Sequence, residues 1–186
     1  PSGASNREAL ELVVEAIAAA GYTPGEQCFV ALDVAASEFV AANGAYSLTK
    51  EQAVLSREHM IELYEGWASE YPIISIEDGL AEDDWTGWSA LTERLGERVQ
   101  TVGDDLYTTD PKLIRQGIEQ SASNAVLIKL NQIGTVSETM EAIGAAKKAD
   151  WGIVISHRSG ETEDTTVADL AVGTAAGQIK AGAPAR

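Results

Sequence analysis

The sequence predicts an α/β fold of about six consecutive parallel βα units. Short apolar runs without polar alternation recur along the chain, as in strands that are buried on both faces of a parallel sheet. Amphipathic stretches with capping residues separate these runs and are typical of helices. No linker or low-complexity segment divides the 186 residues. We therefore expect one domain over residues 1–186.

The strands are expected where an apolar run stops at a polar residue or a glycine. The six runs are 29–32, 72–76, 99–102, 124–130, 152–156 and 178–181. The longest gap between them, residues 34–71, predicts a loop with a small hairpin or lid around residues 44–47, followed by a helix.

The helices are expected behind capping signals. Ser5 and Glu8 form a capping box, and Gly21 fits the position after the first helix. A second helix is expected to open at residues 49–52 and to bury one apolar stripe. Its members are Met60, Ile61, Tyr64 and Trp67. Further helices are expected over 85–95, stopping at Gly96, over 111–120 behind the Asp110 cap, from Thr135 to near Ala149, and over 165–176.

Composition excludes several classes of protein. Thirteen basic and 29 acidic residues give a net charge of −16, which disfavours binding to nucleic acid or to anionic membranes. The single cysteine, Cys28, cannot form an internal disulfide and fits a reducing compartment. The chain has no apolar run long enough to span a bilayer, and residues 1–5 do not resemble a secretory signal. A cytoplasmic location is expected.

Polar side chains lie at or near the C-terminal end of every predicted strand. In chain order they are Asp33, Glu77, Asp104, Lys129, His157 with Arg158 and Ser159, and Lys180. In a (β/α) barrel the carboxyl ends of the strands meet at one mouth, where active sites lie. The sequence therefore predicts part of a TIM-type (β/α) barrel, with these residues around one cavity.

The residue types indicate a chemistry. Three converging carboxylates, Asp33, Glu77 and Asp104, would repel one another without a cation, and oxygen ligands favour Mg²⁺ over Zn²⁺. A partly desolvated lysine near other cations, such as Lys129 or Lys180, can act as a general base. The guanidinium and hydroxyl of Arg158 and Ser159 suit a phosphate or a carboxylate.

Each residue also has a structural interpretation. An aspartate at a strand end is most often a cap or turn residue, and a single lysine there is usually solvated. Asp78 and Asp105 are interpreted as supporting or capping groups, and the tryptophans as packing residues. The acids Glu161, Glu163 and Asp164 are interpreted as a solvated helix start. The joint pattern on successive strand ends favours a functional site.

Six segments resemble the enolase family. They are 31–39 (ALDVAASEF), 75–78 (SIED), 103–106 (GDDL), 127–135 (LIKLNQIGT), 156–162 (SHRSGET) and 178–184 (QIKAGAP). The resemblance runs over essentially the whole chain. It implies an enolase-like eight-stranded barrel and phosphopyruvate hydratase activity, a lyase reaction of glycolysis that interconverts 2-phosphoglycerate and phosphoenolpyruvate.

The resemblance also implies a role for each site residue. Asp33, Glu77 and Asp104 would hold the first of two Mg²⁺ ions, which together neutralise the aci-carboxylate formed from the substrate. Lys129 would remove the C2 proton, and Lys180 would assist at the substrate carboxylate.

Three further roles concern the phosphate and the leaving group. Arg158 and Ser159 would bind the phosphate, with Ser159 also touching the second metal. His157 would lie near the departing hydroxyl group.

The chain also departs from the family pattern. We expect the N-terminal α+β domain, the first barrel strands and the final helix to be absent, together with the glutamates that act at the C3 hydroxyl. The chain ends at Arg186, which fits a proteolytic fragment or a deliberate truncation of a parent that is a homodimer or octamer. The chain by itself is therefore expected to be inactive.

Two alternatives to this function stay open. One is another α-proton-abstracting enzyme of the enolase superfamily. The other is a non-catalytic interaction fragment, since enolases have secondary roles in cell-surface or secreted pools.

Overall fold

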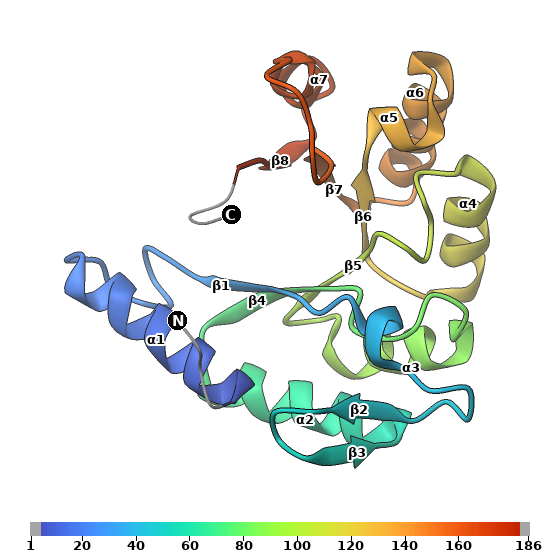
Figure 1. Cartoon of the computed structure of the whole chain (residues 1–186). Coiled ribbons are helices and arrows are strands. Elements are labelled where there is room, and N and C mark those ends of the chain that lie inside the picture. Colours follow the sequence, from blue (N-terminus) through green and yellow to red (C-terminus); the bar gives the residue numbers. More distant parts are fainter. Residues whose placement is uncertain (1–4, 183–186) are drawn as a thin grey trace. The chain divides into compact units, whose positions relative to one another are not determined.

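The computed structural model describes residues 5–182, in which helices and strands alternate along the chain (Figure 1). The chain forms two compact units, Pro1–Thr101 and Val102–Arg186, and the boundary falls inside strand β5 (Gln100–Gly103). Residues 183 and 184, which belong to the last segment that resembles the enolase family, lie outside the described residues.

The first unit is built on two parallel strands, β1 (Val30–Asp33) and β4 (Ile73–Glu77) (Figure 1). Their register pairs Leu32 with Ile76 and Asp33 with Glu77. Both strands begin and end one residue later than the predicted apolar runs. The last residue of each strand is thus acidic: Asp33 in β1 and Glu77 in β4.

Helix α1 (Asn6–Ala19) precedes β1 and has the predicted ends. The Ser5 side chain accepts the N–H of Glu8, and Gly21 has a φ of +86° directly after the C-terminal cap Ala20. A positive φ is accessible to glycine without steric cost, which explains why the helix stops there.

The segment between β1 and the next helix contains the predicted hairpin. A short 3₁₀ helix, η1 (Ala36–Phe39), leads into the antiparallel strands β2 (Tyr46–Leu48) and β3 (Ala53–Leu55).

The predicted start of the second helix at residues 49–52 is wrong. These residues form the hairpin turn, in which Gln52 has a φ of +52° that is incompatible with a right-handed helix. Helix α2 (Arg57–Glu70) begins instead behind Ser56, whose hydroxyl oxygen accepts the N–H of His59. The predicted apolar stripe of this helix is buried as expected.

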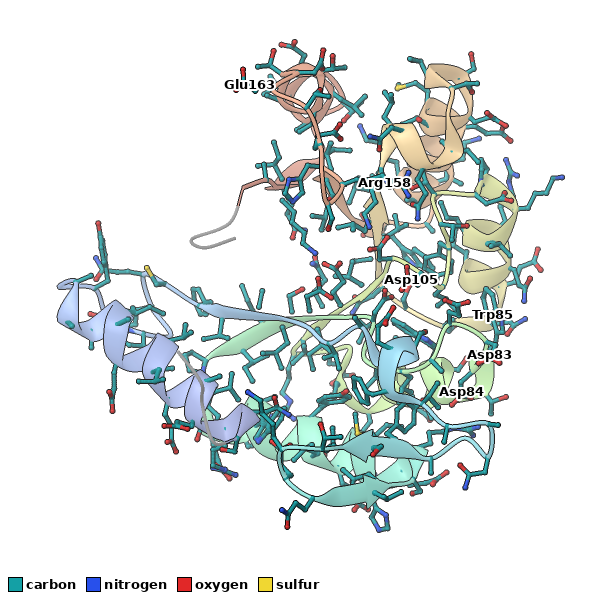
Figure 2. All side chains as sticks on the ribbon, in the orientation of Figure 1. Asp83, Asp84, Trp85, Asp105, Arg158 and Glu163 are labelled. Carbon is teal, nitrogen blue, oxygen red and sulfur yellow. The ribbon has the colours of Figure 1, made fainter. Side chains whose placement is uncertain are left out.

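Helix α3 (Trp85–Leu95) has Asp84 as its N-terminal cap, and Figure 2 labels both Asp84 and Trp85. The Asp84 carboxylate accepts the N–H of Gly87 and, at 2.6 Å, the Nε–H of Arg57 on α2. One acid therefore caps α3 and ties it to α2. The side chain of Trp88, a residue of α3, is fully buried, in agreement with the interpretation of the tryptophans as packing residues.

The second unit is a parallel sheet in which each strand lies next to the following one along the chain. The order is β5, β6 (Ala125–Ile128), β7 (Gly152–Ser156) and β8 (Gly177–Lys180). The helices between them are α4 (Pro111–Gln120), the short α5 (Leu130–Ile133) with α6 (Val136–Lys148), and α7 (Thr166–Gly173). This alternation is the predicted α/β architecture.

Burial varies across this sheet. All four residues of β6 are buried, and Val102, Ala125, Leu127 and Val154 form a core cluster. In β8, by contrast, Ile179 is 50% exposed. The prediction of strands buried on both faces therefore holds for β6 but not for β8, which pairs with one neighbour within this unit. Among residues 5–182, every helix is too short or too polar to cross a bilayer.

Candidate functional site

Two carboxylates end the paired strands of the first unit. Asp33 and Glu77 are register partners, and the backbone ladder continues past them because the N–H of Val34 donates to the Glu77 carbonyl oxygen at 3.0 Å. Asp33 is exposed, whereas Glu77 is only 8% exposed. Neighbouring parallel strands are about 4.8 Å apart, so two acids in register lie close enough to share a cation.

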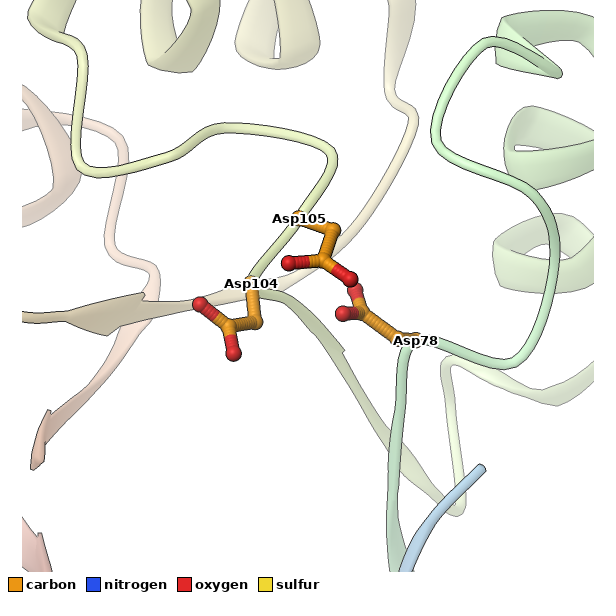
Figure 3. Close-up of side chains that lie close together, drawn as sticks. All are labelled: Asp78, Asp104 and Asp105. Atoms are coloured by element: carbon orange, nitrogen blue, oxygen red, sulfur yellow. The ribbon is translucent and has the colours of Figure 1, made fainter. Parts of the chain in front are cut away.

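The turn after β4 is buried and sharply bent. Asp78 is 4% exposed and has a φ of +45°. Its carbonyl oxygen accepts the N–H of Ala36 at 3.0 Å, which fastens the turn to the start of η1 (Figure 3 shows the Asp78 side chain). The backbone that carries Glu77 and Asp78 is thus fixed on the β1 side.

A part-buried ion pair lies in the second unit. The Lys129 Nζ donates to Asp104 Oδ2 at 2.5 Å, and Asp104 is 7% exposed. Asp104 and Asp105 follow β5 directly (Figure 3), and Lys129 follows β6. The sequence predicted each residue at a strand end, and the structure brings Asp104 and Lys129 into contact.

The electrostatics of Asp104 reflect this environment. Burial raises the pKa of its carboxyl above the ordinary value, because the charged form loses hydration. The hydrogen bond from Lys129 opposes that shift in pKa, as does the positive charge of Lys180, while the Asp105 carboxylate adds to it. Both candidate lysines therefore act on the same carboxyl group.

The backbone of Lys129 is anchored by residues that the sequence reasoning missed. Its N–H donates to Thr109 Oγ1 at 2.9 Å, and that hydroxyl donates to Gln132 Oε1 at 3.0 Å. Thr109 is fully buried with a φ of +61°. Gln132 lies within the resembling segment 127–135, which is the one sequence signal that could have identified it.

The carboxyl end of β7 is tied to β8. Ser156 is in register with Lys180, and the N–H of His157 donates to the Lys180 carbonyl oxygen at 3.1 Å. His157 and Lys180 are both half-buried. The sheet thus places the second candidate lysine beside the His-Arg-Ser segment.

Arg158 and Ser159 are exposed in the loop after β7 (Figure 2 labels Arg158). The Arg158 Nη1 donates to the Asn131 carbonyl oxygen at 3.2 Å, and the Asn131 Nδ2 donates to Glu161 Oε2 at 2.9 Å. The interpretation of Glu161 as a solvated helix-start residue is wrong. Glu161 is half-buried and links this loop to α5, and α7 starts later, at Thr166.

Each unit has a cavity near candidate residues. In the first, a cavity of about 530 Å³ lies among mainly apolar side chains of α1, β1 and α2, and Asp33 lines it. In the second, a cavity of about 370 Å³ lies between α5, β7 and α7, and Asn131, Ser156 and Glu161 line it. The second cavity adjoins the loop that carries Arg158.

The side chains of the candidate metal ligands are of a type that suits a hard cation. Asp33, Glu77 and Asp104 offer carboxylate oxygens, the ligands that Mg²⁺ prefers. Glu77 and Asp104 are both buried, and buried negative charge is costly unless a cation or hydrogen-bond donor balances it. Lys129 supplies part of that balance for Asp104.

A family model described as "Enolase, C-terminal TIM barrel domain" matches residues 1–186. The match agrees with the parallel βα units and confirms the partial TIM-type barrel predicted from the sequence. It covers every strand end that carries a candidate residue. The chain therefore belongs to the enolase C-terminal TIM barrel domain family.

Proposed function

We propose that the protein containing this chain catalyses the Mg²⁺-dependent, reversible dehydration of 2-phosphoglycerate to phosphoenolpyruvate. The observation that carries the proposal is the part-buried Asp104–Lys129 pair, in which a carboxylate and an amine meet just after two neighbouring strands. Both lie in segments that resemble the metal-ligand and catalytic-base segments of enolases. A cytoplasmic location and a place in glycolysis are part of the same proposal.

Asp33, Glu77 and Asp104 are the proposed ligands of the first Mg²⁺, and a second Mg²⁺ binds with the substrate. When bound, the metal ions supply the positive charge that stabilises negative charge developing on the substrate carboxylate. The register of Asp33 with Glu77 supports this assignment, because it sets two oxygen ligands side by side before the ion arrives.

Lys129 is the proposed base that removes the proton from C2 of the substrate. A base must reach its proton within hydrogen-bond distance and in a fixed direction. The bond from the Lys129 N–H to Thr109 fixes the backbone from which this side chain extends. Lys180 is proposed to pair with the substrate carboxylate, which positions C2 against Lys129.

The loop after β7 is the proposed phosphate site. Arg158 offers a guanidinium fork and Ser159 a hydroxyl, and both are exposed and therefore accessible to a ligand. His157 is proposed to lie near the departing hydroxyl group. The hydrogen bond from the His157 N–H to the Lys180 carbonyl oxygen in β8 supports a fixed position for the start of this loop.

Mg²⁺ affinity is expected to fall on acidification earlier than it would for an ordinary aspartate. Burial raises the pKa of Asp104 above 3.8, and a protonated carboxyl group is a poor metal ligand. Affinity should be full above the raised pKa and decrease as the pH falls through it. Calorimetric Mg²⁺ titrations at a series of pH values test this. An affinity that has lost less than half of its full value at pH 3.8 would contradict the expectation.

A substrate panel tests the reaction against its main alternative. The full-length protein is incubated with Mg²⁺ and either 2-phosphoglycerate or carboxylic acids that lack the phosphate but carry an acidic α-proton. Turnover of 2-phosphoglycerate alone supports the proposal. Turnover of an unphosphorylated acid in its place favours another α-proton-abstracting enzyme of the superfamily.

A further inference from the structure

The turn that follows β4 is held by side chains from four separate elements of the first unit. It comprises residues 78–82, directly after Glu77, and residues 78–81 are buried. A turn normally satisfies its backbone groups with water or with its own residues. Here the partners come from η1, the hairpin, α2 and α3.

Three of these partners are buried aromatic side chains. The N–H of Ala81 donates to the Tyr46 hydroxyl oxygen at 3.1 Å, and the Ala81 carbonyl oxygen accepts the Nε1–H of Trp88 at 3.1 Å. The Tyr64 hydroxyl donates to the Gly79 carbonyl oxygen at 2.8 Å. Tyr46, Tyr64 and Trp88 are each no more than 1% exposed, so water cannot substitute for these bonds.

The fourth partner is polar and nearer the surface. The Ser37 hydroxyl oxygen of η1 accepts the N–H of Glu82 at 3.0 Å. The N–H groups of Val34 and Ala36 also donate to the carbonyl oxygens of Glu77 and Asp78. All these hydrogen bonds together fix the backbone from residue 77 to residue 82 on several sides. The space is also filled, since a Cβ on Gly79 would lie 3.1 Å from Ile76 Cγ2.

Tyr46 differs from the other partners in its origin. It is the first residue of β2, in the hairpin between β1 and α2, and Figure 1 shows that hairpin beside α2. Its ring packs edge-on against Phe39, with the ring centroids 6.1 Å apart. The hairpin thus reaches the turn through one buried hydroxyl group, which it presents to a backbone N–H.

We propose that Tyr46 is a positioning residue for metal binding, which holds the turn after β4, and with it the Glu77 carboxylate, in the binding conformation. This inference rests on the proposed Mg²⁺ site. Removal of a group that orients a metal ligand without contacting the metal typically lowers metal affinity about 10- to 100-fold. The hairpin therefore supports the proposed metal site through the Tyr46 hydroxyl group, which is not itself a metal ligand.

The test compares Mg²⁺ affinity with thermal stability in the full-length protein. Y46F removes one oxygen atom and leaves the Ala81 N–H buried without its acceptor. Thr139→Val is the matched control, because it removes a fully buried hydroxyl that donates to the Thr135 carbonyl oxygen at 2.8 Å, in α6 of the other unit. Calorimetry gives the Mg²⁺ dissociation constant, and thermal melting gives stability.

We expect Y46F to raise the Mg²⁺ dissociation constant about tenfold, while Thr139→Val lowers the melting temperature and leaves the constant unchanged. Amide hydrogen exchange in residues 78–82 should also become faster in Y46F. A dissociation constant for Y46F within about twofold of wild type would overturn the inference and leave the proposed function standing. An equal loss of affinity in Thr139→Val would overturn it too.

Two further outcomes are also decisive. If Y46F does not fold, Ser37→Ala takes its place, because it removes the acceptor of Glu82 on the same turn without opening the core; unchanged Mg²⁺ affinity in this variant overturns the inference. If the wild-type protein itself binds no Mg²⁺, the proposed metal site and this inference fail together, and the wild-type titration alone shows it.

Discussion

Replacing Lys129 by methionine is expected to lower kcat of the full-length protein about 10²- to 10⁴-fold, the range typical for the loss of a general base. Methionine is unbranched and only one heavy atom shorter than lysine, but it has no amine to accept a proton. The variant also loses the 2.5 Å contact between Lys129 Nζ and Asp104 Oδ2. Substrate binding should suffer less than turnover, since Arg158 and Ser159 lie on a different loop.

Two measurements check this prediction. Steady-state kinetics give kcat and KM, and exchange of the C2 hydrogen of 2-phosphoglycerate with solvent deuterium reports proton removal directly. The matched control is Lys148→Met at the exposed end of α6, which should keep wild-type kinetics. If K129M retained wild-type exchange at C2, another group would have to be the base.

The second large effect is expected from replacing Gly103 by alanine. A Cβ at this position would lie 2.4 Å from Cε2 and 2.6 Å from Cδ2 of Tyr107, far inside van der Waals contact. The ring cannot move away easily. It is fully buried, its hydroxyl lies 2.8 Å from Ser123 Oγ, and its centroid is 5.7 Å from that of Trp151.

We therefore expect G103A to lower the free energy of unfolding by about 2–3 kcal/mol, as overpacking of a rigid core does. Denaturant unfolding measures the change. Gly144→Ala in the interior of α6 is the control, because a Cβ there meets nothing within 4 Å. The control should gain up to about 1 kcal/mol from the higher helix propensity of alanine. Equal stabilities of the two variants would show that the Tyr107 contact does not restrict Gly103.

Much of the fold could be predicted because local signals agreed with the tertiary structure. Ser5, Asp110 and Thr135 cap their helices through their side chains as expected. The segment 49–52 misled the prediction because Thr49 and Gln52, three residues apart, resemble a capping box. The hairpin register and the left-handed Gln52 override that local preference.

The strand-end positions of the candidate residues could be predicted, but their contacts could not. Strand ends placed Asp33, Glu77, Asp104 and Lys129 from the sequence alone. Their burial and pairing depend on packing that spacing does not encode, as in the Asp104–Lys129 contact. Glu161 was misassigned for the same reason, because its partner Asn131 lies 30 residues away in the chain.

The central claim is that this chain supplies the metal ligands and the base for dehydration of 2-phosphoglycerate. The most direct measurement is the ultraviolet absorbance of phosphoenolpyruvate formed by the full-length protein, with Mg²⁺ and with Mg²⁺ removed by a chelator. We predict steady formation of phosphoenolpyruvate with Mg²⁺ and its loss on chelation, restored by added Mg²⁺. No phosphoenolpyruvate at saturating Mg²⁺ and 2-phosphoglycerate, from protein shown to be folded, would contradict the claim.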